Sequence, residues 1–412
     1  MIRFFHCADL HLGKALSIKS RLTHEQQNLF KEAAYESLNR LIEDAIRVSV
    51  DFIVIAGDVF DDEVRSLKGQ WALSQAFERL GEYGIEVYMS HGNHDPHVSD
   101  NAFTYPDNVH LFGPSGDTFT YESKKGERVR LSGFSYPERA FSKRAVSMFP
   151  ERSPDTDWQI GVLHGQETGV KDHAPYAPFS VSELLPLGYD YWALGHIHKR
   201  MTLSSHPPVI YPGSMQGTNR KESGNKGYLD VRLTGSEVTS EFMATAPVTY
   251  RSIELDVTGM EEWDEVLRLF QEQIPEVRHG QKIIADVSFQ GYTPLYSALN
   301  TRHVDGELHE LLKAGADLDD EWVIDHLSLS GLYDADLALR QEEDPFLADL
   351  HAMKEELHHE EIPAQYLTQL KQNRRLQAYL TKQAELPDKE ELIGQALDYI
   401  SAAVIRKEAD RR

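Results

Sequence analysis

The chain has 412 residues, more than one hydrophobic core usually serves, and its 41% hydrophobic content fits a globular protein of two or three domains. Its 42 basic and 66 acidic residues give a net charge of −24, which argues against a surface coated with basic residues for non-specific nucleic-acid binding. No segment approaches about 18 uncharged apolar residues, and the first residues lack a secretory pattern, so we expect a cytoplasmic protein without a membrane span.

The first half of the chain repeats one pattern, in which a short apolar run is followed by a polar loop. The runs IRFF, DFIVIA, IEVYMS, IGVL and YDYWAL precede the loops HCADLH, GDVFD, HGNHD, HGQ and GHIH, in that order. Runs of this kind predict buried strands. Between them, residues 24–50 and 67–84 place apolar side chains three or four positions apart, which predicts amphipathic helices. The alternation predicts an α/β layered domain whose polar residues gather at one edge of its sheets.

The second half predicts different architecture. Residues 227–244 predict a hairpin that turns near Gly235, and the first domain is expected to span residues 1–248. A small α+β domain is expected over residues 249–335. Its predicted strands and helices are residues 250–258, 281–290 and 321–329, and residues 261–273 and 306–314, respectively. Residues 336–412 alternate charged and apolar side chains at helical spacing, which predicts a helical C-terminal region.

The polar loops of the first half offer oxygen and nitrogen ligands without a thiolate. They contain Asp9, His11, Asp58, Asn93, His94, His164, His196 and His198. This inventory suits manganese, iron, zinc or cobalt better than an all-oxygen magnesium or calcium cage. Two adjacent ions, about 3.5 to 4 Å apart, need roughly four protein ligands each and a bridging carboxylate. The residues of these loops are sufficient in number and kind for such a pair of ions. One motif alone, such as the two histidines of GHIH, is better explained as a solvated strand end, whereas five motifs in succession predict a dimetal centre.

With these five motifs, residues 1–235 resemble the calcineurin-like metallophosphoesterase superfamily, and the segments ADLHLG and YPGS favour its SbcD and Mre11 nuclease group. The resemblance implies a metallophosphoesterase β-sandwich flanked by helices. It also implies the ligands of two divalent ions. These are Asp9, His11, Asp58 and His198 for one ion, and Asp58, Asn93, His164 and His196 for the other, with Asp58 bridging.

The resemblance further assigns two catalytic roles. His94 would be the general acid that protonates the leaving group. Asp61 matches the position that orients this histidine in related phosphatases, whereas archaeal and eukaryotic Mre11 proteins carry a histidine there. The segment after Asp61 also lacks the proline-containing stretch common in the group, which leaves the grip on a nucleic-acid strand open. Asp95 is expected either to support the site or to cap its own turn.

The function implied by the resemblance is a Mn²⁺-dependent nuclease that cleaves DNA at ends or hairpins during repair. It would be a homodimer with an SbcC- or Rad50-type coiled-coil ATPase bound to the C-terminal helices, and residues 249–335 would cap the active site. One alternative is a phosphodiesterase for a cyclic nucleotide or another small diester, but the residues beyond 248 are more than a small substrate requires. The other is a non-catalytic scaffold, which the complete ligand set and His94 argue against.

Three basic pairs fall in or near loops at the edge of the expected site. They are Lys143-Arg144, Lys199-Arg200 and Arg220-Lys221. Such pairs could contact the phosphates of a polymer, which dominate nucleic-acid affinity. Ordinary surface charge explains them equally well.

Overall fold

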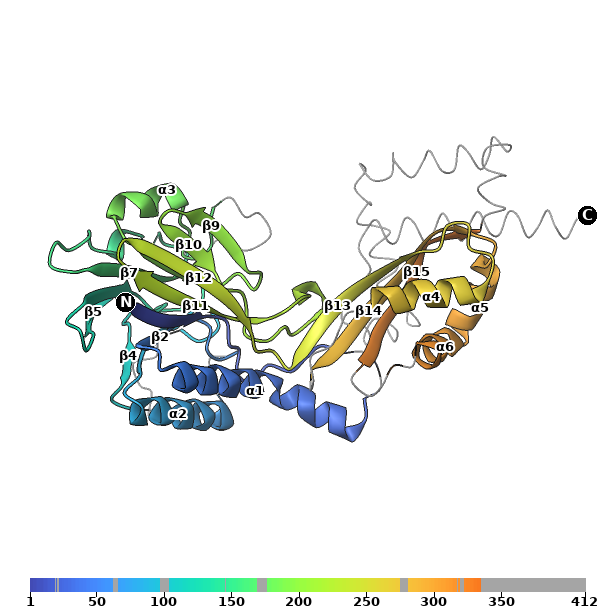
Figure 1. Ribbon diagram of the computed structural model, residues 1–412, viewed down its shortest axis with the longest axis horizontal. Helices are drawn as coiled ribbons and strands as arrows, with labels where there is room; N and C mark the ends of the chain where they lie inside the picture. The colour runs from blue at the N-terminus through green and yellow to red at the C-terminus, as the bar shows by residue number, and fades with distance from the viewer. Residues whose placement is uncertain are drawn as a thin grey trace, which may run out of the picture. The chain divides into compact units, whose positions relative to one another are not determined.

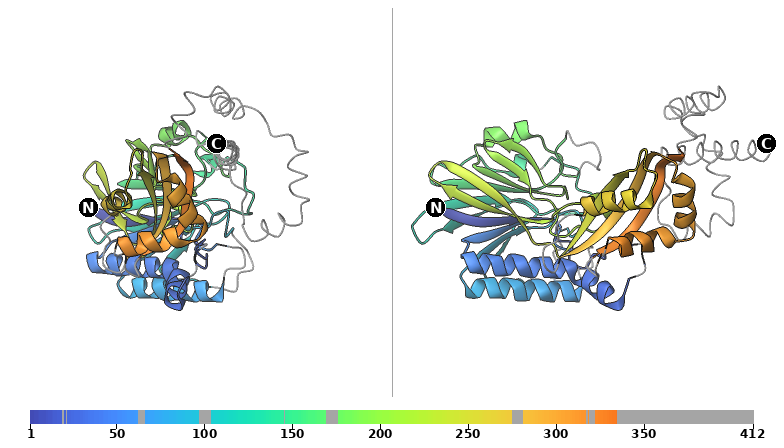
Figure 2. Two further views of the ribbon diagram at one scale, coloured as in Figure 1. Left: turned by 90° about the vertical axis from the view of Figure 1, so that its right-hand side faces the viewer. Right: turned by 45° about the vertical axis from the view of Figure 1, so that its right-hand side comes forward.

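The computed structural model describes residues 1–18, 20, 22–61, 66–96, 104–144, 146–168, 176–274, 281–316, 318 and 322–334 (Figures 1 and 2). The chain divides into two compact units. Unit 1 contains Met1–Arg251 and Val277–Ile284, and unit 2 contains Ser252–Glu276 and the residues from Ala285 onward. The helical region expected over residues 336–412 lies outside the described residues.

Unit 1 contains two six-stranded sheets. The first has the order β12-β11-β1-β2-β3-β4, with the bounds Glu237–Ala244, Gly227–Thr234, Ile2–Cys7, Phe52–Ala56, Glu86–Ser90 and Val109–Leu111. The second has the order β5-β6-β7-β8-β10-β9, with the bounds Asp117–Glu122, Arg128–Gly133, Trp158–His164, Tyr191–Gly195, Pro208–Tyr211 and Met201–Ser205. Strands β1, β2 and β3 run parallel in the first sheet, and β6, β7 and β8 run parallel in the second. The loops that follow neighbouring parallel strands therefore emerge at a common edge.

The two sheets pack face to face because successive side chains of a strand point to opposite sides. In β2, Phe52 and Val54 belong to the apolar core between the two sheets, together with Ile160 of β7 and Ala193 of β8. Ile53 of the same strand points the other way, into the core beneath the helices. Continuous apolar runs such as FIVIA are what a strand buried on both faces requires.

Helices cover the outer faces of both sheets. The helices are α1 (His24–Val48), α2 (Leu67–Glu82) and α3 (Val181–Leu184), with short 3₁₀ turns at Val146–Met148, Leu185–Leu187 and Arg220–Glu222. Figure 1 shows α1 and α2 side by side along the first sheet, and α3 on the side of the second. Thr23 is the N-cap of helix α1, and its side chain accepts a hydrogen bond from the Gln26 amide in a capping box. The predicted α/β class, with a sandwich flanked by helices, is confirmed.

Unit 2 has the α+β composition expected from its sequence. Its three-stranded sheet has the order β13-β14-β15, with the bounds Val248–Asp256, Lys282–Thr293 and Trp322–Asp334. The helices are α4 (Trp263–Gln273), α5 (Tyr296–Val304) and α6 (Glu307–Gly315). Buried Phe270 on α4 and Leu312 on α6 show that the helices turn apolar faces inward. Among the helices of the described residues, none is both long and apolar enough to cross a membrane.

One buried histidine of β1 gives unit 1 a predictable response to acid. His6 is fully buried, its Nδ1 lies 2.9 Å from the hydroxyl of Tyr191, and its Nε2 lies 3.1 Å from the carbonyl oxygen of Leu194. A carbonyl only accepts, so Nε2 carries the proton and the Tyr191 hydroxyl donates to Nδ1. Burial lowers the pKa of His6 to about 3. Both ring nitrogens thus have a partner in the neutral form, and burial opposes the charged form.

We expect His6 to make unfolding easier as the pH falls. The unfolded chain binds a proton near pH 6.5 and the folded chain does not, so stability is complete above pH 6.5 and declines until the pH reaches about 3. This linkage should cost about 2 kcal/mol at pH 5 relative to pH 8. Urea unfolding in EDTA at both pH values should show that His6→Gln loses about 2 kcal/mol less than the native sequence. Equal losses would contradict the prediction.

Candidate metal centre

The predicted ligands lie where the central strands of both sheets end. Asp9 and His11 follow β1, Asp58 follows β2, and Asn93 and His94 follow β3, all in the first sheet. His164 is the last residue of β7, and His196 and His198 follow β8, both in the second sheet. Because the central strands of each sheet run parallel and the sheets pack face to face, side chains from five separated segments meet in one place.

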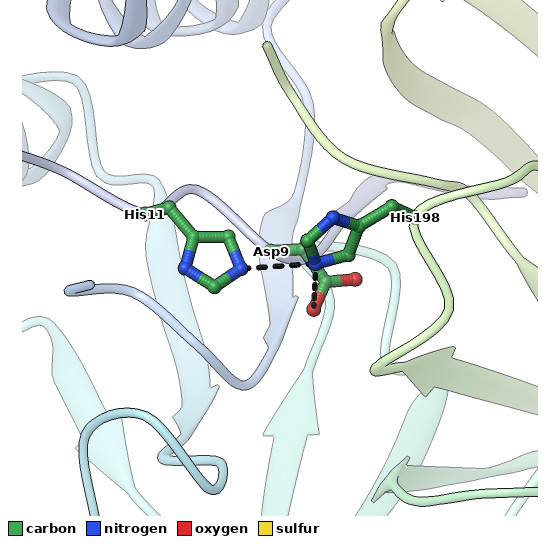
Figure 3. A group of neighbouring side chains, drawn as sticks. All are labelled: Asp9, His11 and His198. Carbon is green, nitrogen blue, oxygen red and sulfur yellow. Dashed lines mark hydrogen bonds and ion pairs between the residues drawn. The ribbon is translucent and has the colours of Figure 1, made fainter. Parts of the chain in front are cut away.

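One group joins Asp9 and His11 to His198. Figure 3 shows the three side chains pointing toward one another. The Nε2 atoms of His11 and His198 lie 3.0 Å apart, and Nε2 of His198 lies 4.0 Å from Oδ1 of Asp9. The backbone amide of His196 donates to both carboxylate oxygens of Asp9 at 3.1 Å, which holds that carboxylate in place.

A second group forms around Asn93 and His164. Nε2 of His164 lies 3.1 Å from Oδ1 of Asn93 and 3.4 Å from Oδ2 of Asp58. Oδ1 of Asn93 also lies 3.1 Å from Nδ1 of His196. The same Oδ2 of Asp58 is 3.8 Å from Nε2 of His11, a member of the first group. Asp58 therefore lies between the two groups.

The centre buries two carboxylates that form no ion pair with a lysine or arginine of the described residues. Asp9 and Asp58 are buried, and within the described part of the chain only histidines form ion pairs with them. Burial raises the pKa of Asp9, and the charge of Asp58 adds to that rise. Burial opposes ionisation of Asp58 too, but His164 outweighs it and lowers the pKa of Asp58. Burial also opposes the charged form of His164, whose pKa the adjacent Asp58 raises to about 9.

Several candidate ligands adopt an unfavourable backbone conformation. The φ angles of Asp9, His11, Asp58 and His196 are 52°, 43°, 49° and 106°. These values lie in the left-handed region of backbone conformation, which residues other than glycine rarely adopt. Such residues cost on the order of 1–3 kcal/mol each and cluster at functional sites. The strain is located at the side chains that converge, which indicates that function fixed these loops.

The geometry fits divalent cations. Three sets of acidic and histidine side chains each bring one donor atom per residue within 4.8 Å of the others: Asp9, His11 and His198; His11, Asp58 and His94; Asp58, His164 and His196. Imidazole nitrogen with carboxylate and amide oxygen is the donor chemistry of first-row transition metals. A cation would also neutralise the two buried carboxylates, which are costly without a positive partner.

His94 belongs to one of these three sets, with His11 and Asp58, and its position is fixed by two hydrogen bonds. Its backbone amide donates to Oδ1 of Asp58 at 2.9 Å, and its Nδ1 lies 2.9 Å from the backbone carbonyl oxygen of Asp61. The Asp61 carboxylate is 3.9 Å from that nitrogen. It lies closer to Nδ1 of His11, at 3.3 Å, and to Nζ of Lys14, at 3.1 Å. The backbone of Asp61 thus contacts the expected acid, while its side chain contacts an expected ligand.

Asp95 ties two of the ligand loops together. Its carboxylate accepts hydrogen bonds from the amides of Val59 and Phe60, which follow Asp58, and from the amide of Gly92 in its own loop. The two roles weighed for Asp95 therefore coexist, because it caps its own turn and supports the neighbouring loop.

Two charged residues lie at the centre although no sequence motif predicts them there. Lys14 directly follows the HLG segment and pairs with Asp61. Glu222 lies 24 positions after His198, yet its Oε1 is 3.2 Å from Nδ1 of His198. Nothing in the residues around Glu222 indicates this contact, because it depends on how the strands between them return to the site.

Comparison with known proteins decides the family. Residues 2–200 match the family model of the calcineurin-like phosphoesterases, and residues 250–330 match that of the middle domain of the metallophosphoesterase YhaO. The chain is 38% identical over 298 residues to the uncharacterized metallophosphoesterase YhaO of Bacillus subtilis, a match that covers 71% of this chain and 72% of that protein. The chain belongs to the calcineurin-like phosphoesterase family.

More distant members of the family have assigned roles. A DNA double-strand break repair protein Mre11 from Methanopyrus kandleri is 29% identical, over 69% of this chain and 64% of that protein. The SbcD component of the nuclease SbcCD from Bacillus subtilis is 26% identical, over 54% of this chain and 64% of that protein. Both matches span less than two thirds of the relative. As a calcineurin-like phosphoesterase, the chain is a phosphoester hydrolase, and the matched residues 2–200 contain the candidate ligands from Asp9 to His198.

Proposed function

We propose that this chain is a Mn²⁺-dependent phosphodiesterase that cleaves DNA at ends or hairpins. The observation that carries the proposal is the convergence of two ligand groups around Asp58, with His94 beside them. One ion would be held by Asp9, His11, Asp58 and His198, and the other by Asp58, Asn93, His164 and His196. When bound, the two cations would activate water and stabilise the charge that develops on the phosphoryl group.

His94 would supply the proton that the leaving group needs. The carbonyl oxygen of Asp61 can only accept, so Nδ1 of His94 carries a proton that stays in this hydrogen bond. The acid would therefore be the imidazolium form, which gives the proton of Nε2 to the leaving oxygen and becomes the neutral ring. The His94 amide meanwhile holds Asp58, so the acid and the bridging carboxylate keep a fixed relation. The side chain of Asp61 would steady His11, and Lys14 would balance the charge of Asp61.

The names of the relatives and the charges near the site support a nucleic-acid substrate. Mre11 and SbcCD are named for DNA repair and nuclease activity. In this chain, exposed Lys199 directly follows His198, and exposed Lys221 directly precedes Glu222. Both could contact phosphates beside the centre. Arg144, by contrast, forms an ion pair with Glu183, and the guanidinium of Arg200 lies 3.8 Å from the ring centroid of Phe242.

Three substrates test the proposal. Purified protein with Mn²⁺ should cleave end-labelled linear duplex and hairpin DNA, with a chromogenic small diester as the third substrate. Cleavage of the small diester alone would favour the alternative phosphodiesterase. No cleavage of any substrate, even with the matching ATPase added, would favour a non-catalytic scaffold.

We also propose the assembly that the resemblance implies, a homodimer with an SbcC- or Rad50-type ATPase in the cytoplasm. Helix α2 exposes two large apolar side chains one turn apart, Leu67 at 85% and Trp71 at 66%. Exposed apolar side chains this close together are typical of protein contacts. We assign them to the homodimer interface. Sedimentation velocity should show Trp71→Lys shifted toward monomer, and an unchanged dimer would refute this assignment.

A further inference from the structure

Glu222 contacts the side of His198 that faces away from the candidate centre. Nε2 of His198 points to Asp9 and His11, as Figure 3 shows for the three labelled side chains. The opposite ring nitrogen, Nδ1, lies 3.2 Å from Oε1 of Glu222. The carboxylate therefore does not compete for the position between the donor atoms. It engages the nitrogen that a metal would leave unused.

The Glu222 carboxylate is itself held by neighbouring donors. Its Oε1 accepts from the hydroxyl of Thr218 at 3.0 Å and from the side-chain amide of Asn219 at 2.6 Å. Its Oε2 accepts from the backbone amide of Thr218 at 3.2 Å, and the hydroxyl of Ser214 donates to it at 3.4 Å. The side chain is only 11% exposed. Few rotamers remain open to a carboxylate bonded in this way.

The backbone of His198 is fixed by the same segment of chain. Lys226, a buried lysine four residues beyond Glu222, donates from Nζ to the carbonyl oxygen of His198 at 2.6 Å. The amide of Ser214 donates to the same oxygen at 3.2 Å. Gly213 permits this close approach, since a Cβ there would lie 2.8 Å from the His198 carbonyl oxygen and its φ is +81°. The YPGS segment and the segment that contains Glu222 and Lys226 therefore both hold His198.

We propose that Glu222 is the positioning residue of His198. It accepts a hydrogen bond from Nδ1–H, so that the lone pair of Nε2 faces the cation shared with Asp9 and His11. This inference rests on the proposed metal centre and concerns a ligand of one of its two ions. A neutral imidazole carries its proton on one nitrogen or the other, and only the deprotonated nitrogen binds metal. A carboxylate on the far nitrogen selects the required tautomer and fixes the ring.

Titration of the metal-free protein with MnCl₂, followed by calorimetry, tests the role of Glu222. Glu222→Ala should bind one of the two ions about 10- to 100-fold more weakly and leave the other unchanged. Glu222→Asp keeps the charge but is too short to reach Nδ1, so it should weaken the same ion. Glu222→Gln keeps an oxygen that accepts from Nδ1 and should recover most of the affinity.

Glu183 provides a matched control. Its carboxylate also accepts from a neighbouring backbone amide and hydroxyl, those of Ser180, but it contacts no candidate ligand. Glu183→Gln should bind both ions as the native sequence does. Native protein that binds fewer than two ions would refute the proposed centre. Native protein that binds two, with both ions equally tight in Glu222→Ala and Glu222→Asp, would refute only the role of Glu222.

Discussion

Replacing Asp58 with asparagine is expected to lower the rate of phosphodiester hydrolysis about 1,000-fold, because a loss of roughly 4 kcal/mol of transition-state stabilisation corresponds to that factor. Oδ2 of Asp58 lies within 3.8 Å of His11 and 3.4 Å of His164, which belong to different ligand groups. Among the described residues, no other carboxylate forms an ion pair with a histidine from each of the two groups. Asparagine preserves the shape of the side chain but offers a neutral oxygen and a donor in place of a shared charge.

Metal content should fall together with the rate. Elemental analysis of Asp58→Asn after dialysis against Mn²⁺ is expected to show fewer than two ions per chain. Asp230 gives a matched control, because it is a buried carboxylate of the same sheet that pairs with Arg3. Asp230→Asn should lose stability and yet retain both ions and its activity per folded molecule. Two tightly bound ions in Asp58→Asn would show that Asp58 does not bridge them.

Replacing His94 with alanine is expected to lower kcat for DNA by about 10²- to 10⁴-fold, the range typical of a lost general acid. The backbone amide that holds Asp58 remains in this variant, so both metal sites should keep their occupancy. A proton donor matters only when the leaving oxygen is strongly basic. The loss should therefore be much smaller for a diester with a nitrophenolate leaving group than for DNA.

The comparison between two leaving groups separates the chemistry of His94 from a structural role. Rates for both substrates would be measured at saturating Mn²⁺, with metal content determined on the same samples. Asp61→Asn makes a useful companion, because it changes the side chain near His11 and leaves the carbonyl that contacts His94. It should slow both substrates alike. An equal loss for both substrates in His94→Ala would contradict its assignment as the acid.

Much of the site was predictable because it lies at the ends of parallel strands. Five apolar runs each ended in a loop rich in potential ligands, and parallel strands deliver such loops to one edge. The structure brings Asp9, Asp58 and His164 together as this rule requires. The outlying strands β4, β5 and β6 were not predicted. Strand β4 has three residues and β5 is half-exposed, so their alternation resembles that of a loop. Strand β6 is largely buried, but Arg128 and Arg130 interrupt its apolar run.

The contacts that support the ligands were not predictable, since they depend on tertiary connection rather than on local pattern. Glu222 reaches His198 only because β9 and β10 turn the chain back after β8. Asp61 illustrates a finer limit. The sequence indicates that it lies near His94, but only the structure shows that its carbonyl makes the close contact and that its carboxylate lies nearer His11.

Because the ligands come from both sheets, the bound ions would also have a structural role. Asp9 and His11 belong to the first sheet and His198 to the second, and Asp58 is likewise opposed by His164 and His196. Each ion would thus cross-link the two layers of the sandwich at one end. Withdrawing the ions should let the layers separate there first, exposing apolar surface to proteases and aggregation. Metal starvation would then shorten the lifetime of the protein as well as stop its turnover.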